Sequence, residues 1–340
     1  RALWAGLAEN PRKTEDERRN GNFPGAQGSL KDASSTDVVV HAGRLLSLFY
    51  QCGDAYAACP ETLEPMGVET FGGRFPTDGV SAHAKVDEGT GELLFFNYSK
   101  VAPYMHYGVV SPGRELVHYV PVPLPGPRSP HDMCFTEHYS ILCDFPLFWD
   151  PKLLPRGVHA TRFYPELPSR FAVIPRYGSS EEIRWFDAGP TFVLHFLNAY
   201  EEGDEIVLDG YRQEDPMPAS EQPFIPQVPE KYRRMMVYLT MSAMKPRLWR
   251  WRFNLATGKT REECLDPRVG LEFGVFNQRQ AGREYRYAYS CVSRPGWFLF
   301  TGVVKHDLKT GQSEEISFGE ERYGSEAPFA PRVGSTGEDD

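Results

Sequence analysis

The sequence lacks any long hydrophobic run, although 41% of its 340 residues are hydrophobic. No apolar stretch approaches the roughly 18 residues that a membrane-spanning helix requires. The segment that begins at Arg1 is polar and has no signal-peptide pattern. These features predict a chain without a transmembrane segment, located in the cytoplasm.

Cysteine is scarce, and no two cysteines form a CxxC pair; the six are Cys52, Cys59, Cys134, Cys143, Cys264 and Cys291. The count is even, but the chain is long and carries no export signal. Reduced and mostly buried thiols are therefore expected. A metal site built from thiolates is not favoured.

A concentrated positive charge is also missing. The net charge is -9, and acidic and basic residues are scattered along the whole chain. Nucleic-acid binding usually requires a basic patch or stripe. The sequence therefore predicts no nucleic-acid partner.

Long amphipathic helices are absent, whereas turn residues are plentiful, with 31 Gly and 29 Pro. Three segments share the pattern Asp/Asn-x-x-Thr-Gly-polar; they are 87–92, 254–259 and 307–312. Asp or Asn starts such a turn through its own side chain, and Gly supplies the positive φ that closes a bulged hairpin. Strand-like runs flank each of the three. Repetition of one hairpin design predicts an all-β chain of repeated antiparallel blades.

Three histidines stand where a loop enters a strand-like run: His83, His131 and His195. Prolines at 127 and 130 restrict the backbone before His131. A single such histidine is more often a hydrogen-bonded core residue. Three of them, far apart in the sequence, fit a metal site to which separate repeats each contribute one ligand.

The segments Pro130-His131-Asp132-Met133 with Thr136-Glu137, and His195 with Asn198-Ala199-Tyr200-Glu201, resemble the carotenoid cleavage oxygenase family. This family includes apocarotenoid and lignostilbene dioxygenases. The resemblance runs from about Thr36 to the end of the chain. It implies a seven-bladed β-propeller with Fe(II) on its axis, held by four histidines, of which His83, His131 and His195 match the first three. No match to the fourth occurs before Asp340.

The resemblance also sets expectations for the domains. Residues 1–35 are expected to form an N-terminal polar segment that opens with a short helix, and residues 36–340 a carotenoid-oxygenase-like propeller. Compared with the family, the first blade and the strand of the fourth histidine are unmatched. We therefore expect a propeller truncated at both ends, with about five recognisable blades.

Glutamates near the metal form a second expectation of the resemblance. Family members support their histidines with glutamates that accept the distal ring N–H. Glu272 and Glu326 match two such positions. A third falls near Gln51, whose amide oxygen would accept more weakly. His41, His106, His118, His138 and His306 are not assigned as ligands.

The implied reaction is oxidative cleavage of a conjugated C=C bond to two carbonyl products, with an apolar small molecule and O2 as partners. It needs no acid–base residue, in agreement with the absence of Ser/His/Asp or paired-carboxylate motifs. An apocarotenoid is favoured over a lignostilbene, because the lysine with which the stilbene branch binds a phenol corresponds to Phe49 or Tyr50. A non-catalytic propeller fragment and an isomerase are the alternatives.

The proline-rich segment 146–170 is rich in large apolar side chains. It fits a loop packed on the propeller face and, equally well, a hydrophobic entrance for the substrate. Peripheral contact with a membrane would serve substrate uptake.

Overall fold

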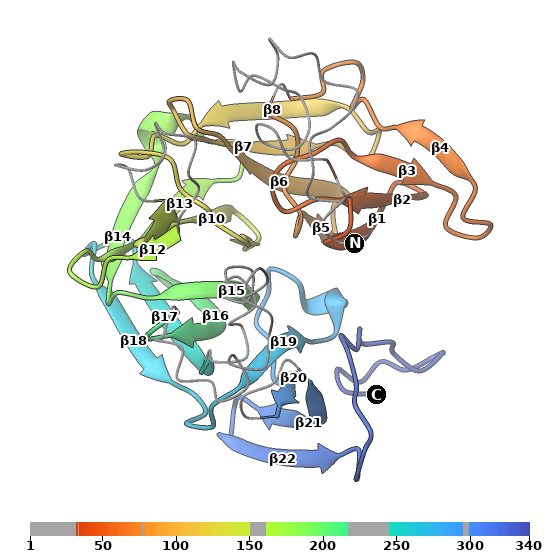
Figure 1. Ribbon diagram of the computed structural model, residues 1–340, viewed down its shortest axis with the longest axis vertical. Coiled ribbons are helices and arrows are strands. Elements are labelled where there is room, and N and C mark those ends of the chain that lie inside the picture. Colours follow the sequence, from red (N-terminus) through yellow and green to blue (C-terminus); the bar gives the residue numbers. More distant parts are fainter. Residues whose placement is uncertain (1–31, 33, 77, 150–160, 217–244, 295–298) are drawn as a thin grey trace, which may run out of the picture. The chain divides into compact units, whose positions relative to one another are not determined.

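The computed structural model describes residues 32, 34–76, 78–149, 161–216, 245–294 and 299–340 (Figure 1). These residues form 22 β-strands, joined by turns and by short 3-10 segments at Ser180–Glu182 and Gln278–Gln280. None of the helices in this part of the chain is long and apolar enough to cross a membrane. The expected helix at the N-terminus lies outside the described residues.

The chain divides into two compact units. Unit 1 comprises residues 1–144 and 170–185, and unit 2 comprises residues 145–169 and 186–340. Two of the boundaries fall within strands, β13 (Ser169–Pro175) and β14 (Arg184–Ala188). The predicted division at residue 35 into a polar segment and a propeller stays a prediction.

Unit 1 contains two complete four-stranded antiparallel sheets and most of a third. The first sheet has the order β1-β2-β3-β4, the second β5-β6-β7-β8, and the third β14-β13-β10-β9. Besides β13 and β14, their strands are β1 (Asp37–His41), β2 (Arg44–Leu48), β3 (Tyr56–Ala58), β4 (Pro65–Val68), β5 (Lys85–Asp87), β6 (Glu92–Tyr98), β7 (Met105–Val110), β8 (Leu116–Pro121), β9 (Cys134–Phe135) and β10 (Tyr139–Asp144).

Unit 2 contains two further four-stranded antiparallel sheets, β15-β16-β17-β18 and β19-β20-β21-β22, and the hairpin β11-β12. Their strands are β11 (Leu147–Trp149), β12 (Thr161–Phe163), β15 (Phe192–Glu202), β16 (Glu205–Gln213), β17 (Arg247–Asn254), β18 (Thr260–Cys264), β19 (Leu271–Val275), β20 (Tyr287–Ser293), β21 (Phe300–Asp307) and β22 (Gln312–Ser317).

Five four-stranded antiparallel sheets are the repeat expected of propeller blades. They confirm the predicted fold class, an all-β chain with about five blades. We number the blades by sequence: blade 1 is β1–β4, blade 2 is β5–β8, blade 3 is β9, β10, β13 and β14, blade 4 is β15–β18 and blade 5 is β19–β22.

The shared turn pattern closes a hairpin in three of these blades, as predicted. In each turn the glycine N–H donates to the carbonyl of the first residue, at 2.7 Å for Gly91, 2.9 Å for Gly258 and 2.8 Å for Gly311. All three glycines have φ between 71° and 73°. A residue with a Cβ adopts such a φ at a cost, which explains the recurrence of glycine.

The strand β20 begins at Tyr287, although the alternation of charged and aromatic residues extends back to Arg283. The residues before it belong to loop structure in which backbone groups bond to Asn198: Arg283 O accepts from Asn198 Nδ2 at 3.1 Å. Tertiary hydrogen bonds thus replace the ladder there.

Within unit 1, blades 1 and 2 share one hydrophobic core. Leu46 and Leu48 of β2 pack with Phe95 of β6, and each is at most 1% exposed. Burial of one such side chain contributes roughly 1.5–3 kcal/mol. This shared core fixes blade 1 against blade 2, and both supply residues to the candidate site.

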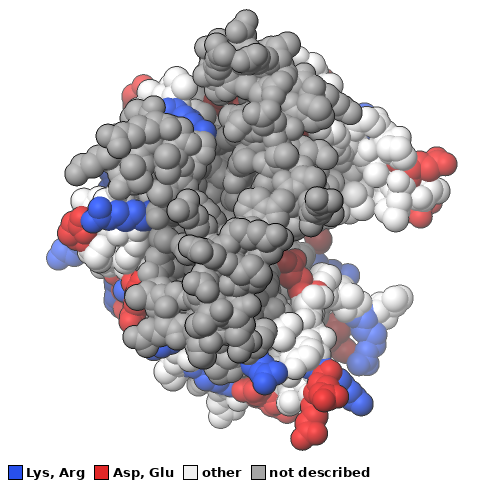
Figure 2. All heavy atoms as spheres, in the orientation of Figure 1, with Lys and Arg blue, Asp and Glu red and all other residues white. Residues whose placement is uncertain are grey.

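Charged side chains of both signs are interspersed on the face shown in Figure 2, where blue and red residues of the described part lie next to one another.

Candidate metal centre

His83 lies at the entry to β5, the first strand of blade 2, and has an unusual backbone conformation. Its φ is 60°, in the left-handed region that residues with a Cβ seldom adopt. Strain of this kind persists only where the surrounding structure enforces it, and it concentrates at functional sites. The His83 ring is oriented by a carboxylate, because Nδ1 lies 3.1 Å from Oδ2 of Asp37 at the start of β1.

His131 lies in the loop before β9, and its ring contacts that of His83. The two ring centroids are 4.8 Å apart, with the planes tilted by 34°. On another side, the ring of Tyr50 stacks on His131 at 5.6 Å. Nε2 of His83 and Nδ1 of His131 are both buried. Unit 1 therefore brings two of the predicted ligands together.

Charged groups surround this pair of histidines. Lys85 Nζ lies 2.7 Å from Oδ1 of Asp132, the residue after His131, and the Asp132 side chain is 1% exposed. Burial lowers the pKa of Lys85, but the hydrogen bond to Asp132 and the negative charges of Asp132, Cys134 and Asp37 together outweigh this and raise the pKa above its ordinary value. Burial raises the pKa of Asp37, but the bond to His83 and the charges of His83 and Lys85 hold it below its ordinary value.

His195 lies in β15 of blade 4, in unit 2, and is 9% exposed. The pairing of β15 with β16 shifts register between Val193 and Phe196, so His195 occupies an irregularity in the ladder. Such bulges redirect side chains. Phe196 pairs with Gly210 of β16, and a Cβ on Gly210 would come within 2.7 Å of the Phe196 ring, so this pairing requires a glycine.

Glu272, the second residue of β19, holds the His195 ring. Nδ1 of His195 lies 2.7 Å from Oε2 of Glu272. The same oxygen accepts a hydrogen bond from Phe273 N at 2.9 Å, and the Phe273 ring centroid is 4.7 Å from that of His195. Oε1 of Glu272 is buried without a hydrogen-bond partner in the described part of the chain. The contact expected between Glu272 and a histidine is present.

The other two positions that the resemblance indicated, Glu326 and Gln51, have different surroundings from Glu272. Glu326 is exposed, so its partnership with a histidine stays a prediction. Together with Glu272 it adds negative charge beside the buried Cys291, and desolvation and these charges raise the pKa of that thiol to about 11. Gln51 donates from Nε2 to the hydroxyl of Tyr50 at 2.5 Å. Gln51 therefore acts on the tyrosine stacked against His131.

Asp37 is a functional candidate that no sequence motif indicates. An aspartate at the start of a strand does not indicate, from the sequence, that its partner is a histidine 46 positions away.

Several other histidines contact backbone or hydroxyl groups. Nε2 of His41 lies 3.1 Å from Gly91 O, and Nε2 of His118 lies 3.1 Å from Gly178 O. His306 is buried, with Nε2 3.0 Å from Ser290 Oγ and Nδ1 3.5 Å from Asp266.

Comparison with known proteins places this chain in a family. The family model described as retinal pigment epithelial membrane protein matches residues 1–340. The carotenoid 9,10(9',10')-cleavage dioxygenase 1 of Arabidopsis thaliana is 32% identical over 326 residues, which cover 90% of this chain. The chain belongs to the carotenoid cleavage oxygenase family. It spans 57% of the length of that plant relative.

Solved structures of carotenoid cleavage oxygenases have the same fold. The Pseudomonas brassicacearum lignostilbene dioxygenase aligns with a TM-score of 0.76 at 28% identity, covering 91% of this chain and 65% of its own. A cobalt-substituted Synechocystis ACO aligns with a TM-score of 0.76 at 23% identity, covering 96% of this chain and 71% of its own. The recognised family and the propeller fold are thereby confirmed.

Proposed function

We propose that His83, His131 and His195 together hold one divalent metal ion, Fe(II). The observation that carries the proposal is the 2.7 Å contact between His195 Nδ1 and Glu272 Oε2. Histidines that bind metals usually direct the other ring nitrogen to a carboxylate or carbonyl, which fixes the ring orientation. His83 has the same arrangement with Asp37, at 3.1 Å. In both residues Nε2 is then the nitrogen for the metal.

The chemistry of these donors suits the ion. Imidazole nitrogen is a good ligand for iron, and three neutral rings leave the ion its full positive charge. The carboxylates of Asp37 and Glu272 contact Nδ1 of the two histidines rather than the metal. From there they orient the rings and raise the basicity of Nε2. When bound, non-haem Fe(II) supplies the one-electron chemistry that allows O2 to react with an alkene.

Aromatic side chains pack against two of the three histidines. Tyr50 stacks on His131 with ring centroids 5.6 Å apart, and Phe273 lies 4.7 Å from His195. Burial raises the pKa of the Tyr50 hydroxyl, so the ring stays neutral. These faces exclude water and suit a flat, electron-rich substrate.

We infer oxidative cleavage of a conjugated C=C bond as the reaction, in which the alkene and O2 become two carbonyl products with one oxygen atom in each. The carotenoid-cleaving plant relative supports a polyene, such as an apocarotenoid, as the substrate. A stilbenoid is the alternative, in keeping with the lignostilbene dioxygenase structure. Phe49 is 3% exposed and Tyr50 faces His131, so the position at which a stilbene-binding lysine was expected carries no ammonium group. This favours the apocarotenoid.

Peripheral membrane contact for substrate uptake and a cytoplasmic location both stay predictions of the sequence.

The test is to load the purified chain with Fe(II) under anaerobic conditions and add O2 labelled with ¹⁸O and an apocarotenoid. We expect the substrate absorption to bleach and two carbonyl products to form. Mass spectrometry should show one ¹⁸O atom in each product. A parallel reaction with a hydroxystilbene compares the two substrate classes.

Three outcomes would contradict the proposal in different ways. A product with the mass of the substrate would indicate isomerisation. Metal binding without turnover of either substrate would indicate that this chain alone is not a dioxygenase. Failure to bind iron at all would indicate a non-catalytic scaffold.

A further inference from the structure

An ion pair lies directly beside the contact between His83 and His131. Lys85 follows His83 by two residues, and Asp132 follows His131 by one. Lys85 Nζ and Asp132 Oδ1 are 2.7 Å apart, and the Asp132 side chain is 1% exposed. Asp132 Oδ1 also accepts a hydrogen bond from the backbone N–H of Met133 at 2.7 Å, which fixes the loop that carries His131.

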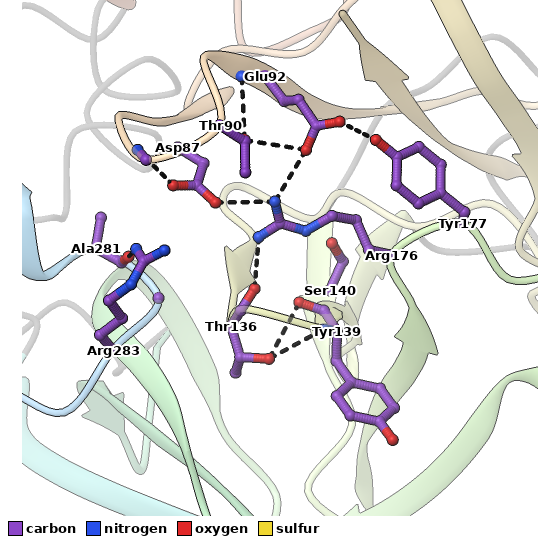
Figure 3. A network of polar contacts seen from close by, with 12 residues as sticks. Asp87, Thr90, Glu92, Thr136, Tyr139, Ser140, Arg176, Tyr177, Ala281 and Arg283 are labelled. Carbon is purple, nitrogen blue, oxygen red and sulfur yellow. Dashed lines mark hydrogen bonds and ion pairs between the residues drawn. The ribbon is translucent and has the colours of Figure 1, made fainter.

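Arg176 connects the same two segments further along (Figure 3). Its Nη1 lies 2.8 Å from Asp87 Oδ2, at the end of β5, and 2.9 Å from Glu92 Oε2. Its Nη2 donates to the carbonyl of Thr136, just after β9, at 2.7 Å. The guanidinium thus joins the β5–β6 turn to the strand that follows His131, and its side chain is 6% exposed.

The contacts of residues 84–87 alternate between two sides of the strand β5. Successive side chains of a strand point to opposite faces. Ala84 and Val86 pack in the shared core of blades 1 and 2. The intervening residues, Lys85 and Asp87, are connected instead to the segment after His131. The start of blade 2 and the start of blade 3 are therefore joined at three successive levels, with the histidine contact at one end.

We propose that Lys85 and Asp132 are positioning residues that fix the rings of His83 and His131 relative to each other for metal binding, with Arg176 anchoring the far end of the same two segments. The proposal rests on the proposed metal site. The Lys85–Asp132 contact is a short charge-assisted hydrogen bond to a buried carboxylate, and such bonds are roughly twice as strong as neutral ones. Loss of it would allow the two loops to move apart by a few tenths of an ångström or more, which a coordination shell tolerates poorly.

The experiment uses Co(II) as the probe, because its visible absorption reports both affinity and coordination without turnover. We compare the wild-type chain with Lys85→Met, which retains the length of the side chain but removes its charge, and with Lys85→Arg, which retains the ion pair. We expect Lys85→Met to weaken Co(II) binding about 10-fold, the lower end of the effect of removing groups that orient metal ligands. We expect Lys85→Arg to bind Co(II) more tightly than Lys85→Met, because it retains a positive charge that can pair with Asp132.

Lys305→Met is the matched control. Lys305 forms a pair of the same type with Asp339, at 2.6 Å, and its side chain is 31% exposed compared with 27% for Lys85. It belongs to unit 2, away from His83 and His131 in the sequence. Its Co(II) affinity and absorption band should equal those of wild type, whatever its melting temperature.

The outcomes separate this inference from the proposed function. Wild-type affinity and an unchanged band in Lys85→Met would overturn the positioning role while the metal site stands. An equal loss in Lys305→Met would also overturn it, because the effect would then be general. If Lys85→Met does not fold, Asp132→Asn provides the same test, since it retains the shape and the acceptor for Met133 N; normal Co(II) binding in that variant would count against the inference. Absence of Co(II) binding by wild type would overturn the proposed function itself.

Discussion

Glu272 is the residue on which the orientation of His195 depends most directly. Replacement of Glu272 by Gln retains an oxygen but removes the charge that favours the N–H of His195 at Nδ1. We expect metal affinity to fall by about 10- to 100-fold. A Co(II) titration measures this, and Gln280→Glu, in the 3-10 segment between β19 and β20, serves as a charge control. Equal affinity in wild type and Glu272→Gln would remove Glu272 from the site.

His306 predicts a specific pH dependence of stability. Desolvation lowers its pKa from 6.5 to about 4, although Asp266 acts in the opposite direction. The folded state thus holds His306 neutral, while the unfolded state binds a proton below pH 6.5. Stability from this group is complete above about pH 6.5 and is lost as the pH falls towards 4, by up to about 3 kcal/mol.

Urea unfolding of wild type and His306→Gln between pH 4 and pH 7.5 checks this expectation. The variant should lose stability less steeply in that window than wild type. Parallel curves for the two proteins would show that His306 does not titrate as the structure implies.

Among the elements, the hairpins that open or close blades were the most predictable. Asp or Asn, Thr and Gly act on their own backbone over a few residues, so the sequence contains the whole interaction. Arg176 is the opposite case. Its partners Asp87 and Glu92 are 89 and 84 positions away, and no local pattern indicates such a pairing. Asp37 was missed for the same reason.

Arg176 also predicts a large effect on stability. In Arg176→Met, Asp87 and Glu92 retain their buried carboxylates without the guanidinium, and breaking a buried pair in this way costs about 3–5 kcal/mol. Arg114→Met is the control in the same unit, because Glu69 would keep Arg44 at 2.6 Å. That variant should lose at most about 1 kcal/mol. Chemical denaturation monitored by circular dichroism measures both, and similar losses would contradict the account.

The turn glycines give a smaller prediction for the same elements. Gly311 has φ of 71°, and a Cβ at this position would point into open space, so Gly311→Ala meets only backbone strain. We expect a loss of about 1 kcal/mol. Gly311→Asn should cost less, since Asn adopts this conformation more readily. Thermal unfolding compares the two, and equal stability of Ala, Asn and Gly would show that the turn is not constrained.

For the whole molecule, the residues proposed to bind the metal belong to both units. Unit 1 holds His83, His131 and Asp37, and unit 2 holds His195 and Glu272. The sequence indicated all three histidines because their motifs resemble those of a known family. It could not indicate that Asp37 contacts His83 or that Lys85 pairs with Asp132, since these contacts depend on packing between blades. A ligand bound by residues of both units would stabilise them together.

The central claim is that His83, His131 and His195 share one metal ion. The most direct measurement is the metal content per chain after anaerobic loading with Fe(II) and desalting, for wild type and for each of the three histidines replaced by Ala. His118→Ala is the control, because that ring contacts the carbonyl of Gly178. We predict one iron per chain in wild type and in the control, and loss of it in all three variants. Full iron content in any one of the three would contradict the shared site.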